Sequence, residues 1–463
     1  MSIPPSDNTT AIDKLADWIV GLQPEQVPAS VQHIAITCLI DTLGVMIAGA
    51  ASRVAAIARA AAADESGSNS GTCTVFGASR YMVASAAAFA NGTAAHALDF
   101  DDNCYAGFVH GSAVIAPAAL AVAQHIDASG RDLLTAFIVG SECEYAVGAA
   151  SRSVLYETGW WTTGVLGPIG ACAAAAWLLR LNRMQTAAAL GLAVAAAGGL
   201  KAGFGTDAKA LMAGRAAQAG VNAAMLARHG ATGPAHAFEH HNGFARLFNQ
   251  GVFDVNKLDR LGREWSLESP GVDIKRIPVC LSSHAAVDAA LELLHENGFS
   301  LDEIASITCD VPPIVIANLV YQQPATRQEA QFSMQFAIAI SLLYGTLGLE
   351  HLNPTALKDE RVIGLMQIID MHQGAQWESR ELLAIAPEGA QVVITLKNGR
   401  RYERFRAAAR GTAADPLSRE EIEEKFLRCL AAGERQDGPI LLANLHALSM
   451  LASCRALVPA RGR

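Results

Sequence analysis

The residue types that could carry chemistry gather in one short segment of this chain. His96 is followed by Asp99, Asp101 and Asp102, and His110 comes eight residues after the last of these acids. Buried carboxylates are costly unless they are paired, and the flanking stretches are rich in alanine. An aspartate that accepts a hydrogen bond from one imidazole nitrogen fixes the tautomer and raises the basicity of the other nitrogen. The segment therefore predicts an acid–base site, and a solvated acidic turn at a helix end is the alternative.

The spacing of His96 and Asp99 indicates how these side chains could meet. The two residues are three positions apart, so a helix through both would place them on one face. We therefore expect Asp99 to orient an imidazole.

The composition excludes several classes of protein. The 463 residues are 51% hydrophobic and only 17% charged, with a net charge of −9. The acidic balance weighs against a nucleic-acid binder and against anionic membrane surfaces. Little charge for a protein of this size indicates that another subunit covers part of the surface, because an average globular chain carries about 25%.

The termini and the cysteines indicate a cytoplasmic protein. Residues 1–17 have no apolar core behind a basic start, so we expect no signal peptide. The nine cysteines include no CxxC pair and are odd in number, which predicts buried reduced thiols rather than disulfides or a zinc site.

The first part of the chain is predicted to be almost entirely helical. Apolar and small residues recur at helical spacing in most of it, and only residues 73–76 are typical of a strand. The expected helices cover residues 31–48, 81–98, 114–125, 133–151, 167–181, 186–200 and 208–229.

The pattern changes after residue 258. Residues 306–311 alternate as a strand does, and residues 391–396 and 401–405 flank Asn398-Gly399, which predicts a β-hairpin with a type I′ turn. Helices are expected at 285–296 and 332–344, and a last helical stretch follows Pro416. The predicted fold is mainly α, with a helical domain at residues 1–268 plus 409–463 and an α+β domain at 269–408.

The segment from His96 to Ser112, HALDFDD followed by HGS, resembles the signature of the MmgE/PrpD family. Residues 205–218, 277–286, 329–333 and 416–426 are similar to further blocks of that family, in the same order. The family includes 2-methylcitrate dehydratase, cis-aconitate decarboxylase and iminodisuccinate epimerase. The resemblance implies a helical domain with an inserted α+β lid, a homodimer, and a site in the cleft between domain and lid that uses no cofactor or metal.

The resemblance also implies a set of site residues. The expected catalytic residues are His110, His284, Asp99, Lys209 and Tyr321, and the expected substrate-binding residues are Asn103, Lys275, Trp161 and Ser283. Each has an ordinary structural alternative: His284 could be a buried histidine at a helix start, Lys209 could extend to solvent, and Tyr321 could anchor a loop. The family motif gives no role to His236, His240 and His241, and we expect them to be dispensable.

These residue types suit proton abstraction next to a carboxylate, with a histidine as base and lysines near the anion that develops. Loss of a hydroxyl gives a dehydratase, return of the proton gives an epimerase or isomerase, and loss of CO₂ gives a decarboxylase. Dehydration or hydration of a small di- or tricarboxylic acid is the leading expectation. A member that only binds a carboxylate is the alternative from another class.

Four departures from the family pattern bear on the substrate. Trp161 and Met212 stand where histidines are expected, Ala146 replaces an arginine, and Asn103 replaces a threonine. These changes remove positive charge, and Trp161 narrows the pocket or makes it apolar. They argue against plain 2-methylcitrate dehydration or cis-aconitate decarboxylation and favour a smaller or less charged acid.

Overall fold

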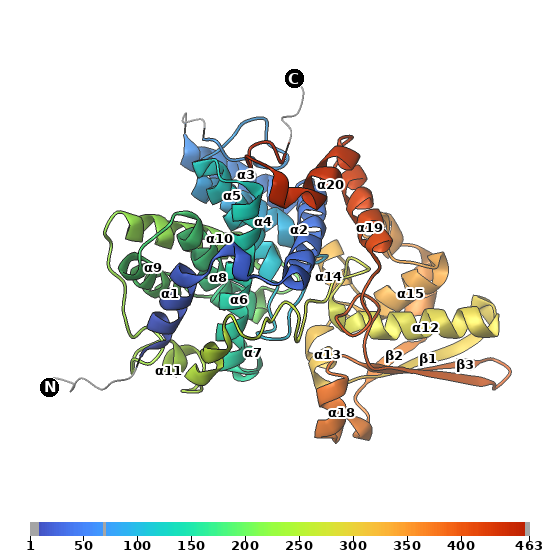
Figure 1. Ribbon diagram of the computed structural model, residues 1–463. Coiled ribbons are helices and arrows are strands. Elements are labelled where there is room, and N and C mark those ends of the chain that lie inside the picture. Colours follow the sequence, from blue (N-terminus) through green and yellow to red (C-terminus); the bar gives the residue numbers. More distant parts are fainter. Residues whose placement is uncertain (1–8, 68–70, 459–463) are drawn as a thin grey trace. The chain divides into compact units, whose positions relative to one another are not determined.

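The computed structural model describes residues 9–67 and 71–458, which form two compact units (Figure 1). The first unit comprises the described residues of Met1–Ala97, Asp101–Val272 and Arg419–Arg463, and the second comprises Leu98–Phe100 and Asp273–Ser418. The chain therefore changes unit near residues 272 and 418, where the sequence analysis placed the boundaries at 268 and 408.

The first unit is built from helices. They are α1 (Ala11–Gly21), α2 (Ala29–Gly49), α3 (Arg53–Ser66), α4 (Ala84–His96), α5 (Gly111–Ile126), α6 (Gly130–Ser151), α7 (Val154–Glu157), α8 (Thr162–Leu178), α9 (Arg183–Ala195), α10 (Asp207–Arg228), α11 (Phe244–Phe248), α19 (Arg419–Ala432) and α20 (Gly438–His446). The helices predicted from the small-residue stretches are confirmed. The predicted strand at residues 73–76 is wrong, because only the pair Cys73 and Met82 bridges there.

Small residues allow the central helices to pack closely. Helix α10 lies against both α4 and α8. At Gly214 on α10 a Cβ atom would lie 2.4 Å from the carbonyl oxygen of Phe89 on α4, so only glycine fits. The close approach of these backbones explains why the sequence is rich in glycine and alanine in these stretches.

Helix α19, in the carboxyl-terminal part of the chain, packs against α2 near the amino terminus. Lys425 on α19 and Asp41 on α2 form a buried ion pair, with 2.6 Å between Nζ and Oδ1. Helices α2 and α6 are long and apolar enough to cross a membrane, but most of α2 and nearly all of α6 are buried inside the protein, as core helices are. All nine cysteines are free thiols and all but Cys280 are buried, as predicted.

The second unit contains a four-stranded sheet in the order β2-β1-β3-β4. The strands are β1 (Ile304–Asp310), β2 (Ile369–His372), β3 (Ala390–Leu396) and β4 (Arg401–Arg406); β1 and β2 are parallel and the other pairs are antiparallel. Helix α12 (His284–Asn297) packs on β3 and β4, and α15 (Met334–Tyr344) packs on α12 and β2 (Figure 1). Short helices complete the unit: α13 (Pro313–Asn318), α14 (Arg327–Ala330), α16 (Pro354–Leu357), α17 (Glu360–Met366) and α18 (Arg380–Ile385).

The predicted hairpin forms between β3 and β4, but its turn is not type I′. That turn needs a positive φ at both central residues. Gly399 has φ of 84°, whereas Asn398 is not among the residues with positive φ. The amide of Gly399 donates to the carbonyl of Leu396, and the amide of Leu396 donates to that of Arg400. The connection is therefore a longer loop that ends in a glycine bulge.

Candidate active site

The chemistry-bearing segment forms the loop between α4 and α5. Helix α4 ends at His96, and Asp99 follows it with a left-handed backbone, φ 49°. Asp99 therefore does not lie on the same helix face as His96, and the expectation drawn from their spacing is wrong. The physical reason is that the helix stops before the acids, and aspartate is one of the few residues that tolerate the left-handed region.

The later part of the loop is fixed by backbone pairing and by the start of α8. Cys104 and Val109 exchange two backbone hydrogen bonds, of 2.8 and 3.1 Å. Phe108 has φ of 52°, which is strained for an aromatic residue, and its carbonyl accepts a hydrogen bond from the hydroxyl of Thr162. The backbone N–H of His110 donates to Thr163 Oγ1 at 2.9 Å. These contacts set the position from which the His110 side chain extends.

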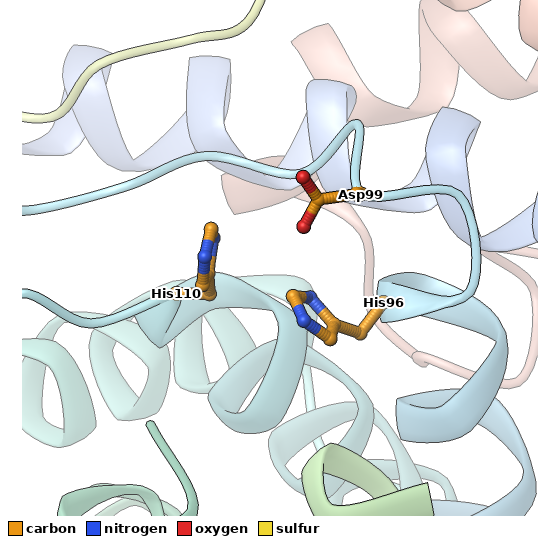
Figure 2. A group of neighbouring side chains, drawn as sticks. All are labelled: His96, Asp99 and His110. Carbon is orange, nitrogen blue, oxygen red and sulfur yellow. The ribbon is translucent and has the colours of Figure 1, made fainter. Parts of the chain in front are cut away.

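A buried carboxylate lies between two imidazoles in the first unit. Asp101 Oδ2 is 2.8 Å from Nδ1 of His96 and 3.4 Å from Nδ1 of His110. The two rings are 4.7 Å apart between centroids, with His96 at the end of α4 and His110 just before α5 (Figure 2). Asp101 and His96 are fully buried, whereas 14% of the His110 side chain is exposed. His110 is thus the imidazole that can meet a ligand.

The tautomer of His110 follows from its partners. Its Nδ1 lies 2.8 Å from the backbone carbonyl oxygen of Asp102, which can only accept a hydrogen bond. Nδ1 therefore carries a proton, and Nε2 is the nitrogen that takes up or gives a proton. The nearby negative charge of Asp101 stabilises the imidazolium that forms when Nε2 is protonated.

Two acids buried in the first unit, Asp102 and Glu144, have a raised pKa. Burial raises the pKa of Asp102 to about 7, although the Ser112 hydroxyl donates to its carboxylate and opposes the shift. Burial raises the pKa of Glu144 to about 8, and neither carboxyl oxygen of Glu144 has a hydrogen-bond partner among the described residues. The first unit therefore contains two buried carboxyl groups that keep their protons at higher pH than usual.

The other predicted residues of the first unit lie in different settings. Lys209, in the first turn of α10, is buried with Nζ 5.0 Å from the ring centroid of Phe204, so it does not extend freely to solvent. Trp161 is buried, and its indole packs on His96 with 5.1 Å between ring centroids. Asn103 is half-buried in the α4–α5 loop. His236, His240 and His241 are exposed.

In the second unit, Lys275 pairs with Asp99. Lys275 Nζ lies 3.1 Å from Asp99 Oδ2 and donates to the Asp99 carbonyl oxygen at 2.7 Å, and both side chains are buried. Lys275 is therefore not an ordinary surface charge. The prediction that Asp99, also labelled in Figure 2, orients His110 stays a prediction, and a carboxylate oxygen of Asp101 lies 3.4 Å from Nδ1 of that ring.

His284 begins α12, as the sequence predicts for this histidine, and it is buried. Its Nε2 is 3.2 Å from the carbonyl oxygen of Val279 and so carries the proton, which leaves Nδ1 as the acceptor. Burial, together with Lys275 and Arg276, holds the pKa of His284 well below its usual range. A neutral imidazole of this kind can accept a proton only with difficulty.

The remaining predicted residues of the second unit, Ser283 and Tyr321, make local hydrogen bonds with the backbone. The hydroxyl of Ser283 donates to the carbonyl of Cys280 at 3.0 Å, which caps the turn before α12. Tyr321 is half-buried, and its backbone N–H donates to the carbonyl of Phe332 at 3.3 Å.

Sequence reasoning did not identify Asp101 as the carboxylate between the histidines. The cluster of acids predicted that one of them would orient an imidazole, but helical spacing pointed to Asp99. Imidazoles and carboxylates are also ligands that divalent metals accept. In the first unit the same carboxylate oxygen faces Nδ1 of both rings, an arrangement that suits an acid–base pair and that equally leaves both Nε2 atoms able to ligate a metal.

The first unit is mainly helical and carries the histidine pair, and the second, α+β unit is inserted into its sequence. Known families can be compared with this combination of fold and site. The MmgE/PrpD N-terminal domain matches residues 13–255, and the MmgE/PrpD C-terminal domain matches residues 277–443. The chain belongs to the MmgE/PrpD family.

Curated relatives align along most of the chain. A cis-aconitate decarboxylase-like protein of Aspergillus oryzae is 30% identical over 447 residues, which is 91% of this chain and 90% of the relative. The cis-aconitate decarboxylase of Homo sapiens is 29% identical and covers 73% of this chain and 71% of its own length. That of Mus musculus is 27% identical, with 89% and 85% covered. The similarity to decarboxylases gives no specific support to the expected dehydration.

Proposed function

We propose that this chain is a cofactor-independent lyase that acts on a small di- or tricarboxylic acid and releases carbon dioxide. The observation that carries the proposal is the hydrogen bonding of His110, whose Nδ1 faces Asp101 and the Asp102 carbonyl while the side chain stays partly exposed. Such an imidazole can transfer a proton through Nε2 at neutral pH. The relatives named as decarboxylases support this reaction over the others.

In the proposed step, the bond between a carbon atom of the substrate and one of its carboxylates breaks. Carbon dioxide leaves, and the electron pair stays on the carbon, where a neighbouring carboxylate stabilises the negative charge. The protonated His110 then gives its Nε2 proton to that carbon, a contribution of typically ~10²–10⁴-fold for such groups. Lys209 is proposed to hold the remaining carboxylate, because fixed positive charge lowers the energy of the anion.

The second candidate is dehydration or hydration of a related acid. It is favoured by one specific observation, a second imidazole, that of His284, whose buried Nδ1 has no hydrogen-bond partner among the described residues. Removing water requires one group that takes a proton from carbon and another that protonates the leaving hydroxyl. His110 and His284 are the two groups that this reaction would use.

Trp161 bears on the choice of substrate. It covers a face of His96 with an uncharged indole, at the position where the family pattern has an imidazole. We therefore keep the proposal that the acid is smaller than cis-aconitate or carries less charge on this side.

We further propose that His284, Lys275, Ser283 and Tyr321 act on the same substrate as His110, and that the protein is a cytoplasmic homodimer. The low charged fraction of 17% supports the dimer. Light scattering at micromolar concentration tests it, since a monomer there contradicts the proposal.

The reaction is tested by ¹H NMR in D₂O with a panel of small carboxylic acids that includes cis-aconitate. Loss of CO₂ with deuterium at the adjacent carbon supports decarboxylation, and formation or hydration of an alkene supports the second candidate. Exchange of a C–H for deuterium without net product indicates an epimerase. Binding without any reaction across the panel contradicts both lyase proposals and indicates a carboxylate-binding protein.

Two controls accompany the panel. His110→Ala should abolish whichever reaction is seen, which separates it from a contaminating activity. Exhaustive chelation should leave the rate unchanged. Activity that is lost on chelation and restored by one divalent ion contradicts the cofactor-independent mechanism.

A further inference from the structure

Lys201 lies at the end of a row of aromatic rings that begins in the α4–α5 loop. Its Nζ is 3.1 Å from the ring centroid of Tyr156. Tyr156 stacks on Phe108 with 5.2 Å between centroids, and Phe108 meets Tyr105 edge to face at 5.5 Å. Phe108 lies two residues before His110 in the chain. The Tyr156 ring thus links the ammonium group to the loop that carries the acid–base histidine.

The backbone around Lys201 is tied to the residue that packs on His96. The amide of Lys201 donates to the carbonyl of Gly159 at 3.1 Å, and the amide of Trp161 donates to the carbonyl of Gly199 at 3.2 Å. Trp160 and Leu200 form the bridge between these two bonds. The Trp161 indole packs on His96, so this short antiparallel bridge links the backbone of Lys201 to a residue that contacts the histidine pair.

No ion pair within the described residues balances the charge of Lys201. Lys201 is half-buried, and among the described ion pairs none includes it. Burial lowers the pKa of its ammonium to about 8, and the more distant Glu157 only partly opposes this shift. A cation on an aromatic face keeps its full charge, so an anion can still pair with it. An anion bound there would recover part of the solvation that burial removes.

We propose that Lys201 binds a second carboxylate of the substrate, at the edge of the His96–His110 site, and so selects dicarboxylic over monocarboxylic acids. The inference rests on the proposed function in assuming that a carboxylic acid occupies the site, but it concerns recognition and not the reaction. Lys201 supplies positive charge on the Tyr156 side of the site, whereas Trp161 leaves the His96 side uncharged. The proposed ligand therefore places its second carboxylate beside Lys201, at the Tyr156 end of the row of aromatic rings.

The test compares maleate with maleamate, two acids of similar shape that differ by one negative charge, in calorimetric titrations of the full chain. Lys201→Met should weaken maleate binding by about 10- to 100-fold, as expected for loss of a hydrogen bond to a charged group. Maleamate binding should change by less than about twofold, and Lys201→Arg should keep most of the preference for maleate. Lys257→Met, at a half-buried lysine elsewhere in the first unit, is the matched control and should change neither ligand.

Equal weakening of both acids, or no change for maleate, would overturn the proposal. If Lys201→Met does not fold, reductive methylation of the wild-type chain decides instead. Millimolar maleate should slow methylation of Lys201 at least fivefold more than maleamate does, read by mass spectrometry, and equal or absent protection contradicts the proposal. These measurements follow binding, so a protein that catalyses no reaction in the NMR panel can still confirm the role of Lys201. Conversely, turnover with no Lys201 dependence contradicts this inference alone.

Discussion

Asp101 is the position at which one substitution tests the proposed acid–base pair most directly. Its Oδ2 lies 2.8 Å from Nδ1 of His96 and 3.4 Å from Nδ1 of His110, and no part of its side chain is exposed. Asp101→Asn keeps the volume and removes the negative charge. The imidazolium of His110 then loses the carboxylate that stabilises it, while the Asp102 carbonyl still accepts from Nδ1 and preserves the tautomer.

The expected effect follows from the charge of this carboxylate. An opposite charge this close stabilises a charged group by on the order of 1–2 pKa units, and each unit, ~1.4 kcal/mol, corresponds to a factor of ten in rate. The kcat of Asp101→Asn should therefore fall about 10- to 100-fold. KM should change little, because Asp101 is fully buried and cannot touch the ligand.

The assay is steady-state turnover of the acid identified by NMR, with circular dichroism and thermal unfolding to establish that the variant is folded. Asp259→Asn removes an exposed aspartate that pairs with Lys14 and serves as the control, with no expected change in kcat. If Asp101→Asn retains kcat within twofold of the wild type while His110→Ala abolishes it, the carboxylate has only a structural role and our reasoning is refuted.

Four further outcomes are expected. His110→Ala should lower kcat about 10²-fold or more, whereas His241→Ala, at an exposed histidine, should leave it unchanged; the reverse result in the same turnover assay places the base elsewhere. Lys209→Ala should lower kcat/KM chiefly by raising KM, because a group that holds a carboxylate binds the ground state and the transition state alike. If only kcat falls, Lys209 has a proton-transfer role instead. Lys425→Met leaves its buried aspartate partner on α2 without that charge and should cost about 3–5 kcal/mol in urea unfolding; a loss under 1 kcal/mol contradicts this. In the folded chain the pKa of Glu144 is raised from 4.5 to about 8, so between these pH values the folded chain keeps a proton that the unfolded chain loses. As the pH rises from about 4.5 to 8, this group should lower the free energy of unfolding by up to about 1.4 kcal/mol per pH unit. Glu144→Gln should reduce the pH dependence of stability by this contribution in unfolding titrations at pH 5, 6.5 and 8, while Asp102, whose pKa is raised to about 7, keeps its own; an unchanged slope shows that Glu144 does not contribute.

The long helices of the first unit could be predicted because their signal is local. The stretch that forms α2, for example, is apolar over five turns, and the predicted range 31–48 lies inside the observed Ala29–Gly49. Strand β2 was not predicted, because Ile369–His372 is only four residues long and gains its conformation from parallel pairing with β1. Pairing with a strand that is distant in sequence cannot be recognised from the residue types of so short a segment.

The same distinction applies to the site. The cluster of His96, His110 and three aspartates predicted an acid–base centre, but the choice among the acids depends on where α4 ends. One left-handed residue at Asp99 turns the chain and makes Asp101 the acid that reaches both rings. Lys201 carried no sequence signal, because its setting depends on a backbone bridge between residues 40 positions apart.

The outer strands of the sheet have a consequence for the solution behaviour of the second unit. An outer strand offers unpaired backbone groups on which another extended chain can add, unless it is short or charged. Strand β2 has only four residues, with Asp370 and His372 exposed, and β4 exposes Arg401 and Glu403. Both outer strands of the sheet therefore disfavour the addition of another strand. Newly made chains are thus less prone to aggregate through this sheet before the surrounding helices have packed.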